Sequence, residues 1–324
     1  MQTSYAFIAL YKQRISAVDL AIQSNQRQHQ EVRVPPQKDG NPYHGVVEHR
    51  KLVQRFRQFL ADEDKFWTQL VLRLSRLFDL QEARPALISL GFLNEADEIL
   101  AVGAASSDGS KAREDGMHVG NGRNHVQFPL EDTSLSYSPA TLEEREDRLS
   151  SFSKALICLG DIARYREQYN ESKGRPRAGH DDAVPARRGK SRRGGAPDVV
   201  RPRNYDRSRQ YYEQAQSLVP HEGNASHQLA ILDSYQKDLF SSIVHYYRSL
   251  CVRQPYDTAA ENLGTVLTKA LEAWKQKMKR EKDKSDMNAA VLAPRVRIEV
   301  FKEKVVVLHA LWRVGMAKGC EKYV

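Results

Sequence analysis

The chain has 324 residues, 40% of them hydrophobic and 28% charged, which is enough for one large domain or two smaller ones with a buried core. Fifty Lys and Arg against 41 Asp and Glu give a net charge of +9, which favours an anionic partner such as nucleic acid, a phosphorylated protein or an acidic surface. The sequence contains no run of eighteen apolar residues, and its N-terminus is too short and polar for a signal peptide. We therefore expect no membrane association.

The three cysteines lie far apart in the sequence, at Cys158, Cys251 and Cys320. None has the paired spacing of a zinc site or of a disulfide framework. We expect them to be buried thiols in a reducing compartment, with no metal and no cofactor in the protein.

The first half of the chain is predicted to be helical, with two long helices at 4–30 and 45–80. The second has the clearest apolar periodicity, with spacings of three and four residues, so it should pack along another helix, most simply an antiparallel one. A shorter helical segment is predicted at 84–101. Residues from about 103 to 127 lack periodicity and apolar mass, which predicts a disordered loop.

Helical periodicity returns at 142, where Thr141 and Glu144 have the spacing of a capping box. The predicted helices are 142–169, 204–219, 223–236, 239–253, 256–283 and 293–316. Between the first two lies an insert, 171–203, with ten Lys or Arg and four Asp or Glu, which is too rich in Gly, Pro and Arg to fold alone. No segment shows strand alternation, so the fold class is all-α.

Joining the segments on either side of the insert reveals a helical repeat. Leu159-Gly160 gives the notch where a second helix approaches, Tyr212 is the aromatic position, and Pro220 ends the unit. A second unit ends at Pro255, 35 residues later, which is one tetratricopeptide length. Two such units are too few to be stable alone, so they should depend on the N-terminal helices.

The segments "LGDIARYR" and "YYEQAQSLVPHEGNASHQLAILDSYQKDLFSSIVHYYRSLCVRQPYDTAAENL" resemble the Est/Smg family of telomerase-associated and nonsense-mediated mRNA decay scaffolds. The resemblance is weaker over 1–80 and absent from the two inserts. It implies a 14-3-3-like and tetratricopeptide-type helical array that continues into antiparallel helical hairpins. On this basis we expect one helical domain over 1–275, with inserts at about 103–127 and 171–203, and the start of a C-terminal helical-hairpin region over 276–324.

The resemblance also implies a phosphoserine site. Its "GDxxRY" pattern, shared with 14-3-3 proteins, assigns Arg164 and Tyr165 to the phosphate, and Lys12 in "LYKQRI" resembles the family's early lysine. His227 stands where many relatives carry an asparagine, so it is a candidate contact to the peptide backbone. Arg166 receives no role and is expected to face solvent. By spacing alone, Arg164 could instead form an ion pair with Asp161 one turn earlier.

For the function, the resemblance implies a non-enzymatic scaffold of nonsense-mediated decay whose chief ligand is the phosphorylated RNA helicase. A heterodimer with a related family member and a location in both nucleus and cytoplasm are further expectations. No HExxH, P-loop or nucleophile elbow occurs, and we expect no enzyme activity.

Two other function classes stay open. One is telomere maintenance through binding of telomerase RNA or single-stranded DNA by basic surfaces, such as the face at 275–284 and the basic segment of the insert. That segment equally fits a nuclear-localisation signal, and it contains Arg187, Arg188, Lys190, Arg192 and Arg193. The other is a helical-repeat adaptor that needs no phosphate.

Overall fold

The computed structural model describes residues 2–31, 44–93, 141–172, 175–176, 202–282 and 293–317. The chain forms two compact units, 1–208 and 209–324, which we call unit 1 and unit 2 and describe separately. The described segments are helical apart from their connections and one pairing of two-residue strands, so the predicted all-α class is confirmed. No helix of the described segments is long and apolar enough to cross a membrane.

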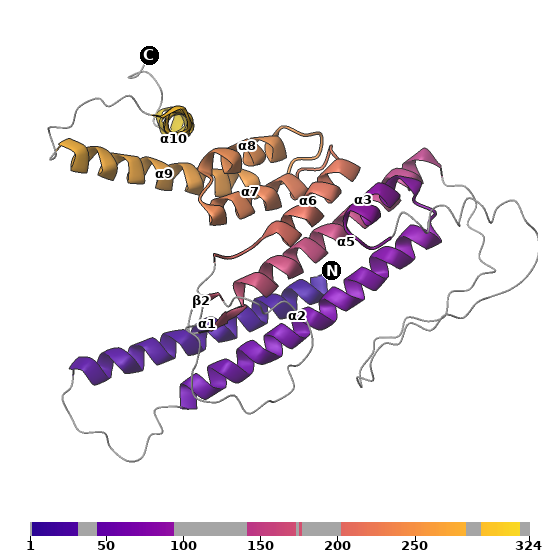
Figure 1. The fold of residues 1–324 in the computed structure, drawn as a ribbon, viewed down its shortest axis with the longest axis horizontal. Coiled ribbons are helices and arrows are strands. Elements are labelled where there is room, and N and C mark those ends of the chain that lie inside the picture. Colours follow the sequence, from indigo (N-terminus) through magenta and orange to yellow (C-terminus); the bar gives the residue numbers. More distant parts are fainter. Residues whose placement is uncertain are drawn as a thin grey trace, which may run out of the picture. The chain divides into compact units, whose positions relative to one another are not determined.

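Unit 1 is built on three long helices, α1 (Gln2–Glu31), α2 (His44–Leu77) and α5 (Leu142–Gln168). Helix α2 runs antiparallel to both of its neighbours (Figure 1) and packs against each of them. The predicted apolar stripe of α2 explains this position, because its buried side chains recur at helical spacing. They are Phe56, Leu60, Trp67 and Val71.

The capping box predicted at the start of α5 is present. The Glu144 amide donates to the Thr141 hydroxyl oxygen, and the Thr141 amide donates to the Glu144 carboxylate. These two bonds satisfy backbone donors that a helix start leaves without a partner inside the helix. From Phe152 to Ile162 the helix is almost entirely buried, and this buried stretch leads directly into Arg164 and Tyr165.

The segment predicted as one helix at 84–101 is shorter in the structure. A 3-10 turn (Gln81–Ala83) leads into α3 (Arg84–Ser89). The helix ends because Gly91 adopts a positive φ of 72°, a conformation typical of a glycine that terminates a helix. Residues 94–101 lie outside the described part of the chain.

A two-residue antiparallel pairing joins β1 (Glu171–Ser172) to β2 (Arg175–Pro176) at the start of the predicted basic insert. The rest of the insert up to residue 201, including all five basic residues between 187 and 193, lies outside the described residues. So does the loop predicted at about 103–127.

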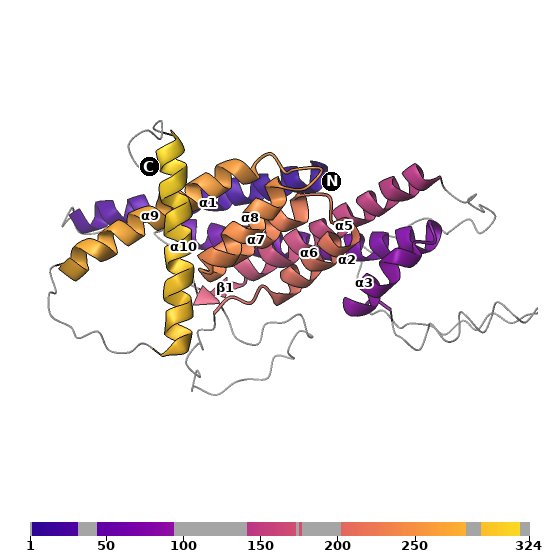
Figure 2. The ribbon, with the colours of Figure 1, turned by 90° about the horizontal axis from the view of Figure 1, so that it is seen from above.

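Unit 2 contains most of α6 (Asp206–Leu218), and then α7 (Asn224–Gln236), α8 (Leu239–Leu250), α9 (Ala259–Lys282) and α10 (Pro294–Ala317). All five agree with the predicted helices to within three residues at each end. Helices α7 and α8 pack as a hairpin, and α10 packs on α8 and α9, crossing α9 steeply (Figure 2). The domain boundary expected at residue 275 falls inside α9, which continues to Lys282.

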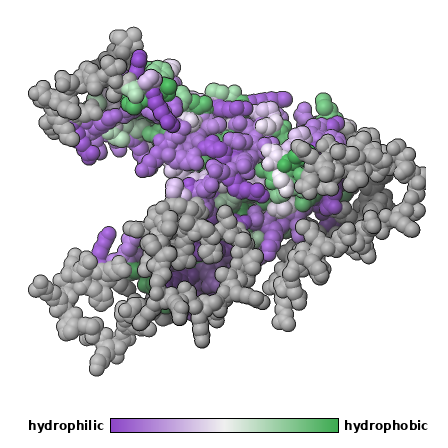
Figure 3. All heavy atoms as spheres, in the orientation of Figure 1, coloured by the Kyte–Doolittle hydropathy of each residue, from purple (hydrophilic) through white to green (hydrophobic). Residues whose placement is uncertain are grey.

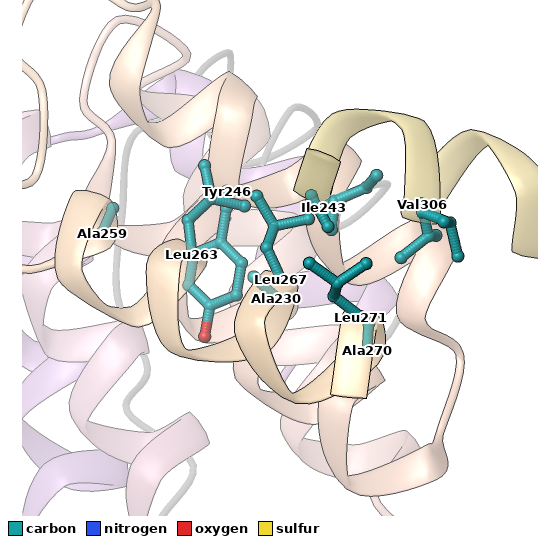
Figure 4. Packing of buried hydrophobic residues seen from close by; sticks show 11 residues of the cluster. Ala230, Ile243, Tyr246, Ala259, Leu263, Leu267, Ala270, Leu271 and Val306 are labelled. Atoms are coloured by element: carbon teal, nitrogen blue, oxygen red, sulfur yellow. The ribbon is translucent and has the colours of Figure 1, made fainter. Parts of the chain in front are cut away.

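The core of unit 2 lies among α7, α8, α9 and α10. One buried cluster contains Tyr246 and Ile243 of α8, Leu263 and Leu267 of α9, and Val306 of α10 (Figure 4). Helix α10 also shows apolar atoms on the molecular surface, visible as green spheres in the α10 region of Figure 3.

Candidate phosphate site and family membership

The three residues assigned to a phosphate meet at one aromatic ring. The ammonium of Lys12, on α1, lies 5.0 Å from the centroid of the Tyr165 ring on α5. The guanidinium carbon of Arg164 lies 4.9 Å from the same centroid. The two cations are therefore at most about 10 Å apart, roughly one Debye length at 0.1 M salt. Residues separated by more than 150 positions in the sequence thus converge.

Exposure differs sharply between the two cations. Lys12 is exposed, whereas Arg164 is only 6% exposed and Tyr165 is half-buried. The Lys12 side of the cluster is therefore open to solvent, whereas the Arg164 charge lies among buried residues of α5. A buried guanidinium retains its charge because its intrinsic pKa is above 12, but it must be compensated.

Asp161 supplies that compensation. Its carboxylate lies 2.6 Å from the Arg164 guanidinium, so the ion pair that the i,i+3 spacing offered is present, and it is buried. This pair is the role that the structure gives to Arg164, and the assignment of Arg164 to a phosphate stays a prediction.

Tyr5 is a participant that the sequence analysis missed. Its hydroxyl donates to Asp161 over 2.7 Å and lies 3.5 Å from the Cys158 sulfur. The residue is 36% exposed, but its hydroxyl end is directed at Asp161 and Cys158. Desolvation of this end, reinforced by the Asp161 charge, raises the pKa of Tyr5 above its usual value, so the phenol keeps its proton and donates it. Tyr5 and Asp161 are 156 positions apart, and no sequence pattern links them.

Helix α2 fixes the end of α5 that carries the cluster. Arg166 pairs with Asp64 of α2 at 2.7 Å and is half-buried, so the expectation that it faces solvent is wrong. The Arg57 Nε donates to the Tyr169 carbonyl over 2.6 Å, at the last turn of α5 where helix carbonyls lack partners inside the helix. These bonds orient α5 independently of Lys12.

The buried cysteine beside Tyr5 leads to a prediction. Burial raises the pKa of the Cys158 thiol to about 11, so at pH 8 only about one molecule in a thousand carries the reactive thiolate. Cys251 is exposed, against the expectation of a buried thiol. We expect iodoacetamide at pH 8 to label Cys251 at least about 100-fold faster than Cys158, measured by peptide mass spectrometry. Equal labelling rates in the folded chain would contradict the burial of Cys158.

His227, the candidate for a peptide-backbone contact, belongs to unit 2. Its side chain is buried, its Nε2 lies 2.8 Å from the Asn262 amide nitrogen, and its ring centroid is 4.6 Å from that of Tyr256. These contacts describe a histidine held within unit 2 between α7 and α9, and a role in peptide binding stays a prediction. Among the described residues, no group of three or more His, Cys, Asp or Glu side chains could hold a metal ion.

Two family models match this chain. The model described as "Telomerase activating protein Est1" matches residues 1–170, which include Lys12, Arg164 and Tyr165. The model described as "Est1 DNA/RNA binding domain" matches residues 208–311, which include the five helices of unit 2 almost completely. The two matched ranges end and begin on either side of the basic insert.

Curated relatives agree with these matches. The chain is 34% identical over 144 residues to nonsense-mediated mRNA decay factor SMG7 of Arabidopsis thaliana, which is 44% of this chain and 11% of that protein. It is 32% identical over 141 residues to telomerase-binding protein EST1A of Danio rerio, covering 44% of this chain and 7% of the relative. For SMG7 of Danio rerio the identity is 38% over 118 residues, 36% of this chain and 7% of the relative.

The aligned stretches thus span only about a tenth or less of these relatives' length. The family assignment itself rests on the model that covers more than half of the chain, 170 of 324 residues. The resemblance noted at "LGDIARYR" is thereby confirmed, and the chain belongs to the Est1 family.

Proposed function

We propose that this chain is a non-enzymatic scaffold of nonsense-mediated mRNA decay that holds a phosphoserine segment of the phosphorylated RNA helicase. The observation that carries the proposal is the position of Lys12 and Arg164, each within about 5 Å of the Tyr165 ring centroid. The similarity to two SMG7 proteins, which are named as factors of this pathway, supports the decay context.

The three side chains suit a phosphate ester. A phosphoserine carries −1.5 to −2 charges near pH 7 and three acceptor oxygens. Arg164 brings a planar fork of donors, Lys12 brings a point charge, and the Tyr165 hydroxyl brings a neutral donor. Each charge-assisted hydrogen bond contributes about 1.5–3 kcal/mol net.

Lys12 is the residue on which to test this function. Because Lys12 is exposed, reversing its charge leaves the packing of unit 1 intact, whereas Arg164→Glu would place a second carboxylate beside buried Asp161. We expect Lys12→Glu to weaken binding of a phosphoserine peptide about ten- to a hundredfold, from the loss of one charged contact. The measurement is calorimetric titration with helicase-derived peptides, each prepared with and without the phosphate on its serine.

Arg14→Glu is the matched control. Arg14 is also exposed on α1 and the substitution makes the same change in net charge, but Arg14 lies two residues and about 200° around the helix from Lys12. It should leave the affinity within about twofold, because its charge lies on another side of the helix. Equal loss of affinity in both variants would indicate that binding depends on the net charge of the chain and not on the position of Lys12. Equal affinity for the phosphorylated and unphosphorylated peptides would contradict the proposal and favour the phosphate-independent adaptor.

Nucleic-acid binding is the second candidate function, and the match of 208–311 to a DNA/RNA-binding family model favours it. The telomerase-binding relative fits this reading. Helix α9 carries exposed cations at Lys275, Lys279 and Arg280, whereas Lys277 is paired with Glu303 at 2.8 Å. Cations along one helix bind phosphates electrostatically and carry little information about base sequence.

Salt dependence separates the two candidates. If unit 2 binds RNA or single-stranded DNA, log affinity should fall linearly with log salt, and Lys275→Glu with Lys279→Glu should make the slope shallower by about 1.4 for a single strand. Lys12→Glu should then have little effect on RNA binding. If the chain is a phosphopeptide scaffold, Lys12→Glu should weaken peptide binding, and Lys275→Glu with Lys279→Glu should have little effect on it.

A further inference from the structure

Two side chains of α1 contact α5 at matching intervals. The Tyr5 hydroxyl lies 3.5 Å from the Cys158 sulfur, and these residues are 153 positions apart in the sequence. The Lys12 ammonium lies 5.0 Å from the Tyr165 ring centroid, and these residues are also 153 positions apart. The interval between the two contacts is therefore seven residues on each helix.

Equal intervals tie the two contacts to one relative position of the helices. Helices α1 and α5 both run antiparallel to α2 and are therefore parallel to each other (Figure 1). Seven residues advance a helix by about 10.5 Å and bring the side chain back to within about 20° of the same side. A shift of α1 along α5 by one residue, about 1.5 Å, would displace both contacts together. Whatever fixes Tyr5 on α5 therefore also fixes Lys12.

The contact at Tyr5 is the directional one of the two. The Tyr5 hydroxyl donates to Asp161 Oδ2 over 2.7 Å, and a hydrogen bond weakens steeply when its geometry changes. Its acceptor is held in place, because Asp161 Oδ1 accepts from Arg164 over 2.6 Å within α5. The attraction between an ammonium and an aromatic ring is more permissive, since it extends to about 6 Å from the ring centroid. The hydroxyl bond is thus the better determinant of the register between α1 and α5.

Lys12 depends on this register more than Arg164 does. The Lys12 side chain is exposed, and in the described part of the chain its ammonium contacts the Tyr165 ring and pairs with no carboxylate. Arg164 is held by Asp161 from within its own helix, an ion pair that needs no contribution from α1. A change at Tyr5 should therefore act on the cluster through Lys12.

We propose that Tyr5 is a positioning residue of the phosphate cluster, whose hydrogen bond to Asp161 holds α1 in the register that places Lys12 beside the Tyr165 ring. Tyr5 lies two helical turns before Lys12 and acts through it. The effect on peptide binding rests on the proposed phosphoserine function, whereas the position of Lys12 can be measured without a ligand.

Tyr5→Phe removes the hydroxyl and keeps the ring. We expect it to weaken binding of the helicase-derived phosphoserine peptide about fivefold or more and to leave binding of the unphosphorylated peptide within about twofold. Tyr11→Phe is the matched control on the same helix. Among the described residues, Tyr11 contacts the rings of Phe56 and Phe59, with centroids 5.0 and 5.7 Å away, and its hydroxyl makes no hydrogen bond. Tyr11→Phe should leave both affinities within about twofold.

A double-mutant cycle with Lys12→Met separates positioning from general stability. Lys12→Met removes the charge and keeps most of the length of the side chain. If Tyr5 acts through Lys12, adding Tyr5→Phe to Lys12→Met should lower the remaining affinity less than about twofold. An equal loss from Tyr5→Phe with and without Lys12 would overturn the proposal, because it would show that the hydroxyl only stabilises unit 1.

The position of Lys12 is measured in the free chain by NMR of isotope-labelled lysine ε-methylene groups. The ring current of Tyr165 should shift the Lys12 signal, which Lys12→Arg identifies by removing it. Tyr165→Leu should abolish this shift, Tyr5→Phe should reduce it, and Tyr11→Phe should preserve it. An unchanged shift in Tyr5→Phe would overturn the proposal. If the wild-type chain bound both peptides equally, the proposed function would fail, and the NMR shift would still decide whether Tyr5 positions Lys12.

Discussion

Replacing Gly223 by alanine is expected to lower the free energy of unfolding of unit 2 by about 3 kcal/mol or more, because no space exists for a single methyl group at this position. A Cβ at residue 223 would lie 2.3 Å from the Ser249 carbonyl oxygen and 2.8 Å from the Tyr256 amide nitrogen. Both are backbone atoms, and they belong to segments already fixed by hydrogen bonds. The Tyr256 amide donates to the Ser249 carbonyl, and the Gly223 amide donates to the Gln254 carbonyl.

The cost of Gly223→Ala arises from close approach and not from an unusual backbone conformation, since φ at Gly223 is −81°. The start of α7 and the connection from α8 to α9 are pressed together at this glycine, so a methyl group must push them apart. Packed interiors resist such a shift because neighbouring groups have few alternative positions.

Gly264→Ala is the matched control for Gly223→Ala. A Cβ at Gly264 would also meet an atom within 3 Å, but that atom is the guanidinium end of Arg313, a long side chain that can move aside. Since alanine is about 1 kcal/mol more favourable than glycine inside a helix, Gly264→Ala should be neutral or stabilising. Hydrogen exchange over α7, α8 and α9 measures both variants, and equal protection in Gly223→Ala and the wild-type chain would contradict the predicted clash.

The helices could be predicted from the sequence because their signals are local. The periodicity of α2 and the capping box of α5 each lie within a few turns of chain, and the structure agrees with both. The predicted helix at 84–101 is shorter because Gly91 takes a left-handed conformation, a choice that depends on the turn around it. Periodicity also could not show which side of α10 packs on α8 and α9, because that depends on how the helices assemble.

The candidate site could be predicted only through the family resemblance. Lys12 and Tyr165 are 153 positions apart, and nothing in their local sequence indicates that the Lys12 ammonium lies 5.0 Å from the Tyr165 ring centroid. Asp161 could be read from its spacing to Arg164, but a spacing of three does not distinguish a surface pair from a buried one. Tyr5 could not be found at all, since its contact with Asp161 exists only once α1 and α5 are packed in unit 1.

The burial of the Arg164–Asp161 pair has a measurable consequence for stability. We expect Asp161→Ala to lower the free energy of unfolding of unit 1 by about 3–5 kcal/mol, because removing one partner of a buried ion pair leaves the other charge without its compensation. The two side chains are 8% and 5% exposed and their atoms are 2.6 Å apart. The same substitution also removes the acceptor of the Tyr5 hydroxyl.

Asp64→Ala provides an identical substitution in the neighbouring ion pair. Asp64 pairs with Arg166 at 2.7 Å, but these side chains are 29% and 26% exposed, so water screens the pair and can solvate the arginine left behind. We expect Asp64→Ala to cost less than about 1 kcal/mol. Both positions lie in helices, so the gain in helix propensity from Asp to Ala is the same in the two variants and cancels in the comparison.

Hydrogen exchange along α5 should report the loss in Asp161→Ala and near-wild-type protection in Asp64→Ala. The double variant Asp161→Ala with Arg164→Leu separates the two causes of instability. If the uncompensated guanidinium is responsible, removing it should restore most of the stability. Equal destabilisation by Asp161→Ala and Asp64→Ala would show that Arg164 is accessible to water. It would contradict the claim that Arg164 is a buried cation compensated by Asp161, on which the proposed phosphate site depends.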